Sequence, residues 1–382
     1  MQLTMFSGRY KMYILICISI YREERIFLPK TVIVDGGRSL IKTLHCRDRL
    51  AFPAVIAPGR EFQMPVKEND PLRAMHVTIK GGPEGFPEGE YFVGELAIQQ
   101  ARGEATQKRD RQKINKNNLV LSIAAASLYA FNGAEIRLVA NLPARDWRSQ
   151  KDALAVSLTG RYTVQHHRGF LSGMVHNFSV GPVIVLPEGA AAYFGAIWRM
   201  DWVDGIGKGT PEVRNAVLGQ GTCRVIDVGD TTVNVVTMRD QEYIDNECFT
   251  RDLGLHRANS EILAWARNKY EGLELSLPEL EDILRQADPA YMHGTTKIDF
   301  AAKKDERYAL LAGQIAADMQ AQLHTVTHHV LLSGGGCVAL ADYLTAVFSR
   351  QSNVVYDVWE AQWLNALGMQ VMVGLSDADA AA

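Results

Sequence analysis

Two copies of one strand–turn–strand pattern, about half a chain apart, constrain the fold of this sequence most. The first is TVIVDGGRSLIK (residues 31–42) and the second is RVIDVGDTTVNVV (residues 224–236). In each copy, Val, Ile and Thr favour buried strands, whereas glycine and aspartate favour a turn at the tip. A recurring unit of this kind predicts two related α/β halves that face each other. A ligand between the halves would meet both tips.

Length and composition fit this division of the chain. The 382 residues are 47% hydrophobic and 22% charged, which is ordinary for a soluble protein large enough to hold two domains. The net charge of -3 argues against a nucleic-acid binder that uses its whole surface, although it is compatible with a local basic patch. We therefore expect no direct DNA binding.

The cysteines and the N-terminal segment indicate in which cellular compartment the protein is found. The five cysteines form no Cys-x-x-Cys pair, which is typical of reduced thiols in a cytosolic protein rather than of disulfides or structural zinc. An apolar run at residues 12–21 is too short to span a bilayer, and no small-residue cleavage site follows it. We expect no membrane association and an N-terminal extension, residues 1–30, ahead of a domain that begins near Thr31. A misassigned start codon gives the same pattern.

The two hairpin tips have the composition of a phosphate-binding site. Glycine-rich tips direct unpaired backbone N–H groups at one point, and such nests bind phosphate oxygens. The candidate phosphate-binding residues are Gly36, Gly37, Arg38 and Ser39 at the first tip, with Lys42 as a point charge, and Gly229, Asp230, Thr231 and Thr232 at the second. Asp35 and Asp227 would face each other and repel phosphate unless a divalent cation lay between them. The pattern therefore predicts a Mg²⁺ site at these two aspartates.

Two further motifs suit a nucleotide. The turn of Ser333, Gly334, Gly335 and Gly336 lies between a predicted strand and a predicted helix, and it leaves room for a flat ring such as adenine or guanine. Glu188 lies in a Pro-Glu-Gly turn before an alanine-rich helix. From there it can polarise the water that attacks a γ-phosphate.

Each motif also has an ordinary structural interpretation. The acidic tip can be a simple hairpin, and the glycine triplet can be a turn that starts a helix. Glu188 can be a charge favoured at a helix N-terminus, and Lys42 a solvated strand end. The ordered set, from the first hairpin with its lysine to the glycine triplet, favours nucleotide binding.

Helical patterns lie between these motifs. We expect helices at residues 118–131, 253–270, 277–286 and 306–324, the third with a capping box made by Ser276 and Glu279. A small β-containing insertion is expected at about residues 45–115. The last seven residues, 376–382, are expected to be frayed.

The motifs resemble those of the actin and sugar-kinase ATPase superfamily, and within it the actin-like proteins of the ParM/StbA plasmid-segregation type. The first tip resembles the first phosphate loop of the family at its Asp-x-Gly-x-x-x-x-Lys spacing, the second tip resembles the second loop, and SGGG resembles the adenosine motif. Four other segments resemble ParM-like chains more than eukaryotic actin: YFVGELA (91–97), LVANLPARDW (138–147), LPEGAAAYFGA (186–196) and WLNALG (363–368).

The resemblance implies an α/β fold of the actin-like (ribonuclease H-like) type, duplicated, with two domains around a nucleotide cleft. The implied divisions are a first domain at residues 31–182 that holds the insertion, a second domain at 183–350, and a return to the first domain at 351–382.

The resemblance also implies roles for single residues. Asp35 and Asp227 would manage Mg²⁺, Glu188 would orient the hydrolytic water, and the segment from Glu279 to Arg285 would contact the nucleoside sugar. Arg38 stands where actins usually have a small hydroxyl residue, and Asp230 is an extra acid at the second tip. The nucleotide is expected to be ATP, with GTP possible.

The implied function is that of a cytoplasmic ATPase that assembles with itself into filaments, hydrolyses ATP there, and segregates plasmid DNA through a DNA-bound adaptor protein. The alternative is a small-molecule, sugar-type kinase of the same superfamily, which would need a carboxylate base for the substrate hydroxyl; Glu188 is the one candidate. A chaperone-like ATPase would carry a substrate-binding domain after the nucleotide fold. The basic run at residues 107–118 fits a solvated loop better than a filament or adaptor contact.

Overall fold

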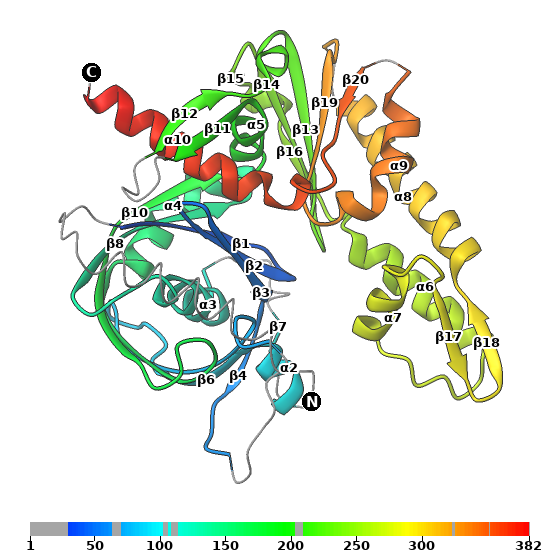
Figure 1. Cartoon of the computed structure of the whole chain (residues 1–382). Coiled ribbons are helices and arrows are strands. Elements are labelled where there is room, and N and C mark those ends of the chain that lie inside the picture. Colours follow the sequence, from blue (N-terminus) through cyan, green and yellow to red (C-terminus); the bar gives the residue numbers. More distant parts are fainter. Residues whose placement is uncertain are drawn as a thin grey trace, which may run out of the picture.

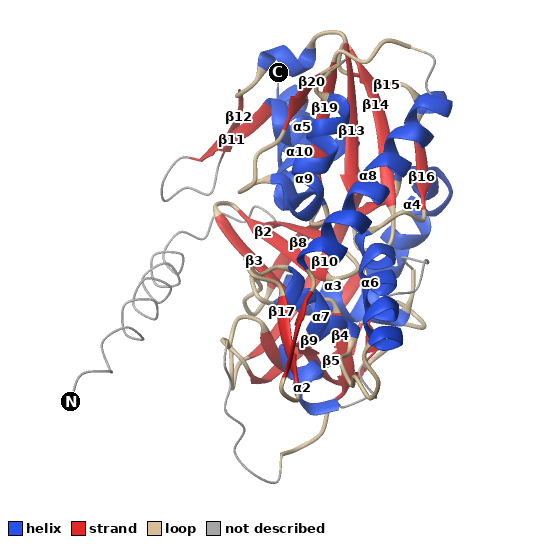
Figure 2. Cartoon of the chain, turned by 90° about the vertical axis from the view of Figure 1, so that its right-hand side faces the viewer, coloured by secondary structure: helices blue, strands red, loops and turns tan. Residues whose placement is uncertain are grey.

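The structure is a computed structural model, and it describes residues 30–62, 70–101, 106–107, 114–202, 209–322, 325–350 and 352–381. These residues form two lobes, each built on its own β-sheet (Figures 1 and 2). The expected N-terminal extension lies outside the described residues, apart from Lys30, and so does half of the basic run at 107–118, namely residues 108–113.

The first lobe is built on a sheet in which ten strands are described. In sheet order the strands are β3 (Asp48–Pro53), β2 (Leu40–His45), β1 (Lys30–Gly36), β8 (Ala134–Leu142), β10 (Val175–Pro187), β9 (Gly160–Arg168), β5 (Ala74–Gly81), β6 (Gly89–Gly94), β4 (Val55–Pro58) and β7 (Thr106–Gln107). The middle strands β1, β8 and β10 are parallel, so their carboxyl ends meet at one edge. Strands from the expected insertion extend the far end of this sheet.

Among the described residues, the first lobe has helices α2 (Glu95–Ala101), α3 (Lys116–Ser127) and α4 (Ala144–Leu158). Helix α3 is buried from Asn118 to Ser127, as its continuous apolar run predicts, and Asn115 caps its first turn through a hydrogen bond from the backbone N of Asn118. It packs into the same core as the sheet residues Val32, Ile136 and Val164. A helix buried on all sides can have no polar face, which explains its alanine-rich sequence.

The second lobe has a smaller sheet and four of the helices that the structure describes. Its strands follow the order β15 (Glu242–Tyr243), β14 (Val233–Arg239), β13 (Thr222–Val228), β19 (His329–Ser333) and β20 (Asn353–Val355), and β16 (Phe249–Arg251) pairs with β14. Its helices are α6 (Leu255–Lys269), α7 (Leu277–Leu284), α8 (Ala301–Gln322) and α9 (Cys337–Phe348), and β17 (Ala290–His293) and β18 (Thr296–Asp299) form a separate hairpin. The capping box of α7 is confirmed. Helix α8 begins five residues before the expected start because its first turn continues directly from Phe300, a core residue.

Helices α5 (Ala190–Ile197) and α10 (Leu364–Ala381) cross where the lobes join, and α10 runs from there to the C-terminus (Figure 1). Two glycines allow the crossing. A Cβ on Gly368 would overlap the carbonyl oxygen of Ala191, and a Cβ on Gly195 would lie 2.6 Å from the carbonyl oxygen of Leu364. The backbones therefore touch without side chains between them.

We expect Gly368→Ala to destabilise the fold by about 2 kcal/mol, because the added methyl group forces the two backbones apart. Urea unfolding followed by circular dichroism measures this. The matched control is Gly313→Ala in α8, where a Cβ meets no atom within 4 Å and helix propensity predicts a gain of up to about 1 kcal/mol. Equal effects of the two substitutions would contradict the close crossing.

The expectation that residues 376–382 are frayed is wrong for the residues that the structure describes. Helix α10 continues to Ala381, and Asp377 accepts two hydrogen bonds from the Arg137 guanidinium, at 2.9 and 2.5 Å. Terminal residues are expected to be poorly ordered unless they are tied down, and here a bidentate pair with an arginine on β8 anchors the helix.

Candidate functional site

Both acidic hairpins form as predicted. Strands β1 and β2 pair antiparallel around the first tip, and β13 and β14 pair antiparallel around the second, from Val228 opposite Val233. The tips belong to different lobes and are in contact, because the Arg38 guanidinium donates a hydrogen bond to the Thr231 hydroxyl. The structure therefore brings together two turns that lie nearly two hundred residues apart.

Asp35 is a buried acid at the carboxyl end of β1, 3% exposed. Its carboxylate accepts hydrogen bonds from the Lys42 ammonium on β2 (2.7 Å) and from the side-chain amide of Asn141 on β8 (2.7 Å). Asn141 also accepts one from the backbone N of Gly36, at 3.2 Å. Since a buried carboxylate needs partners, these contacts fix its position.

Asp227 occupies the corresponding place on β13 and is 5% exposed. Burial is the main cause that raises the pKa of its carboxyl group to about 6, and the negative charges of Glu188 and Asp35 add to the effect. The Lys42 charge and a 3.1 Å hydrogen bond from the Asn365 amide oppose it. The Asp227 carboxylate therefore interacts electrostatically with both acids of the first lobe.

Glu188 lies in the turn between β10 and α5 and is 9% exposed. Its carboxylate accepts a hydrogen bond from the Asn234 amide on β14, at 3.2 Å, and Asn234 in turn accepts one from the Thr250 hydroxyl, at 2.8 Å. The first lobe therefore supplies the acid, and the second lobe supplies the group that orients it.

The glycine triplet lies at the end of β19, beside β13, with Ser333 opposite Asp227 in the parallel register. Gly334 has φ +91°, and a Cβ there would lie 2.6 Å from Asp227 Oδ1, so only glycine fits. A Cβ on Gly335 would meet no atom within 4 Å, so open space lies next to this turn. The turn therefore borders the acidic centre on one side and free space on the other.

Glu279 is placed differently from the other candidates. It is exposed, and its carboxylate accepts hydrogen bonds from the backbone N (2.8 Å) and the hydroxyl (2.5 Å) of Ser276 in the capping box. Two residues further along α7, Glu281 approaches Asp230 at the second tip and His256 on α6, with ligand atoms within 4.8 Å of one another. Glu281 is therefore the α7 residue that faces the second tip.

Three asparagines were not among the sequence candidates: Asn141, Asn234 and Asn365. Each holds one of the three buried acids, and Asn365 also accepts a hydrogen bond from the backbone N of Gly189, at 2.9 Å. The sequence could have indicated Asn141 as a site residue, because Asn141 lies near the carboxyl end of β8, a parallel strand next to β1. The partners of the other two depend on contacts between the lobes.

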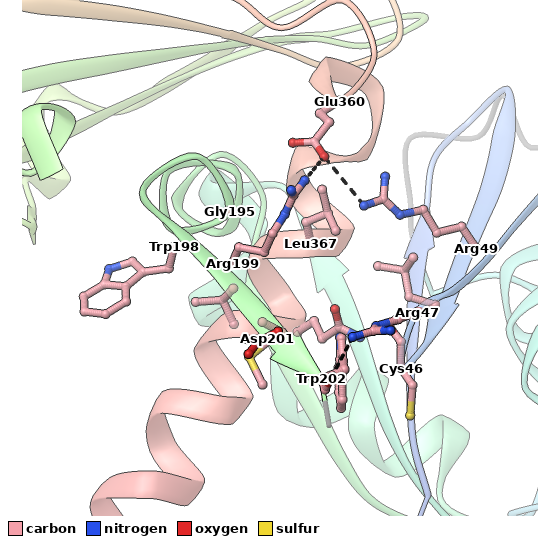
Figure 3. Close-up of a pocket in the computed structure, with 14 residues that line it drawn as sticks. Cys46, Arg47, Arg49, Gly195, Trp198, Arg199, Asp201, Trp202, Glu360 and Leu367 are labelled. Atoms are coloured by element: carbon pink, nitrogen blue, oxygen red, sulfur yellow. Dashed lines mark hydrogen bonds and ion pairs between the residues drawn. The ribbon is translucent and has the colours of Figure 1, made fainter. Parts of the chain in front are cut away.

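A separate cavity of about 340 Å³ lies beside α10, and none of the sequence candidates lines it (Figure 3). It is bordered by β2, β3 and by β11 (Trp198–Trp202), which pairs with β12 (Gly209–Val213). At its edge Glu360 forms ion pairs with Arg49, Arg199 and Arg214, one from the first lobe and two from the β11–β12 hairpin. The next residue, Ala361, accepts a hydrogen bond from the backbone N of Gly334, at 2.9 Å.

Two protein-family models match the chain in succession. Residues 34–190 match the model described as "Actin like proteins N terminal domain", and residues 225–346 match "Archaeal actin homologue MreB-like, C-terminal". The chain therefore contains an actin-like N-terminal domain followed by a C-terminal domain of the archaeal actin-homologue type. The actin-like fold expected from the sequence is thereby confirmed.

Solved structures similar to this actin-like chain agree with that assignment at the level of the fold. A ParM filament from Clostridium botulinum is 21% identical, with a TM-score of 0.72 over 91% of this chain and 99% of the other. An archaeal actin homologue is 17% identical, with a TM-score of 0.70 over 91% and 99%. ParM from Bacillus thuringiensis with ATP is 17% identical, with a TM-score of 0.66 over 92% and 99%.

No curated protein sequence matches this actin-like chain. Among the helices of the described residues, none combines the length and the apolar character needed to cross a membrane.

Proposed function

We propose that this actin-like protein binds ATP between its two lobes and hydrolyses it. The observation that carries the proposal is the convergence of three buried carboxylates, Asp35, Glu188 and Asp227, with two glycine-rich tips from opposite lobes. The backbone N–H groups of the tips and the Lys42 ammonium would bind the phosphates. The open space beside Gly335 suits the nucleoside base. ParM from Bacillus thuringiensis has been solved with ATP and with ADP.

The donor set at the centre fits a divalent cation. Hard cations such as Mg²⁺ prefer carboxylate oxygens. Burial is the main cause of the raised Asp227 pKa, and a cation would relieve the smaller contribution that the negative charges of Glu188 and Asp35 make. Asp35 and Asp227 would hold Mg²⁺, directly or through its water molecules. When bound, the ion neutralises charge that develops on the phosphate oxygens.

Glu188 would orient the attacking water. Its carboxylate is fixed by Asn234, so it needs little reorganisation when the water binds. The hydrogen bond from Asn234 crosses between the lobes, which makes the orientation of Glu188 dependent on their separation. Hydrolysis would therefore respond to lobe closure.

We further propose that the protein assembles into filaments and acts in the cytoplasm, in plasmid segregation through a DNA-bound adaptor. The similarity to a ParM filament supports assembly, and the motifs shared with ParM-type chains support the partition role. GTP is the second candidate nucleotide.

Light scattering and phosphate release, measured together on the full chain, test the proposal. We expect scattering to rise on addition of ATP with Mg²⁺ and to stay flat with ATP and a chelator. Phosphate release should follow the rise. Phosphorylation of an added sugar without scattering would favour the kinase instead, and absence of nucleotide binding by calorimetry would refute both.

A further inference from the structure

A cluster of two imidazoles and one carboxylate lies in the first lobe, outside the proposed nucleotide site. His76 on β5, Glu90 on β6 and His167 on β9 each offer one ligand atom, and these atoms lie within 4.8 Å of one another. His76 is buried, and the other two are half-buried, so the cluster is reachable from solvent. We call these residues the His76–Glu90–His167 trio.

Strand pairing explains how the trio assembles. Strand β5 lies between β6 and β9, and Glu90 pairs with Thr78, which shares a strand face with His76. On the other side the register shifts, with Arg168 opposite His76 and His166 opposite Val77, so His167 is an extra, bulged residue. A bulge redirects a side chain, and here it brings the His167 ring to 4.6 Å from the His76 ring, centroid to centroid.

The present contacts of the trio are two side-chain hydrogen bonds. His76 Nε2 lies 2.6 Å from Glu90 Oε1, and because a carboxylate accepts hydrogen bonds, the ring nitrogen donates. The Thr78 hydroxyl lies 2.7 Å from His167 Nε2. Burial lowers the pKa of His76, as do the nearby His167 and Arg168, whereas Glu90 raises it. The neutral ring is the form that binds metals.

We propose that His76, Glu90 and His167 bind one Zn²⁺ ion, or a transition-metal ion of similar ligand preference, with water as the fourth ligand. Two imidazoles and a carboxylate are a set that zinc takes in proteins with an open fourth position. Metal–ligand bonds of about 2 Å fit atoms this close after small side-chain rotations. The ion takes the place of the proton between His76 Nε2 and Glu90 Oε1, and the neutral ring then carries its one proton on Nδ1.

The surroundings of the trio set its properties. Phe62 stacks on Phe92 and meets the edge of His76, which shields one side. The Arg168 guanidinium lies over the Phe62 ring at 4.4 Å and places a positive charge near the site, which opposes a cation. A bound ion would link three adjacent strands and stiffen this end of the sheet, the lower part of the molecule in Figure 2.

Calorimetric titration of the metal-free full chain with Zn²⁺, in the presence of Mg²⁺, tests the site. We expect one Zn²⁺ per chain in the wild type, and affinity at least tenfold lower in Glu90→Gln and in His167→Asn. Glu90→Gln keeps the shape and an acceptor for His76, so it should fold. The control, Glu84→Gln, makes the same charge change in an exposed turn of the same lobe and should bind as the wild type does.

Two further measurements distinguish metal binding by the trio from a metal-free hydrogen-bond network and from metal binding by cysteines. Arg168→Gln should tighten Zn²⁺ binding, because it removes the opposing charge. Co²⁺ in place of Zn²⁺ should show no thiolate absorption. Equal Zn²⁺ affinity in the wild type, Glu90→Gln and His167→Asn, a thiolate signal, or no binding by the folded wild type would overturn the proposal.

Discussion

Glu188→Gln should slow ATP hydrolysis by about 100-fold or more, within the range that positioned acid–base groups contribute, while nucleotide affinity stays nearly unchanged. The amide keeps the shape of the side chain and its contact with Asn234, but it is a poor acceptor for the proton of the attacking water. Phosphate release measures turnover, and calorimetry with a non-hydrolysable ATP analogue measures affinity. Filaments should then form on ATP and persist longer than wild-type filaments.

Glu135→Gln is the matched control, because Glu135 is exposed on β8, away from the acidic centre. It should leave turnover at the wild-type level. If Glu188→Gln hydrolyses ATP as fast as the wild type does, Glu188 does not orient the water. If it instead loses affinity for the analogue, its role is in binding.

Asp227→Asn is expected to stabilise the nucleotide-free protein while it abolishes stabilisation by ATP with Mg²⁺. In the folded state the Asp227 pKa is raised from 3.8 to about 6. Because this pKa is higher in the folded state than in the unfolded state, the free energy of unfolding falls as the pH rises from 3.8 through 6. The full loss, about 3 kcal/mol, is present above that range. The neutral amide removes this cost and removes the proposed ligand of the cation.

Thermal unfolding at a series of pH values measures the effect. The difference in Tm between Asp227→Asn and the wild type should be largest near pH 8 and should shrink as the pH falls toward 5. Asp152→Asn, an exposed acid on α4, should show no such trend. An Asp227→Asn protein that is less stable than the wild type at pH 8, or that is still stabilised by ATP with Mg²⁺, would contradict the assignment.

The sequence predicted the site residues whose motif lies within a few consecutive positions. Asp35 and Asp227 each end a buried strand before a glycine, so strand propensity and turn chemistry in a few residues predicted both hairpins. The partner asparagines could not be predicted in this way. Asn365 contacts Asp227 across 138 positions of sequence, and nothing in its neighbourhood indicates that contact.

The histidines of the first lobe illustrate the same limit. Alternation along a strand predicts which residues share a face, but the bulge at His167 breaks the alternation, and its position depends on how β9 pairs with β5. The prediction that residues 376–382 are frayed was wrong for a related reason. Its partner, Arg137, comes from a strand 240 positions earlier, so local composition could not indicate the ion pair.

Helix α10 has a consequence for synthesis of the chain on the ribosome. Its residues Ala366, Met369 and Val373 complete a core that otherwise consists of first-lobe residues and Ala191, and its first residue, Leu364, belongs to the core of the second lobe. During translation, an apolar face of the first lobe therefore stays uncovered until nearly two hundred further residues have been made. The cores of both lobes are completed by α10, which is made after the strands of both sheets.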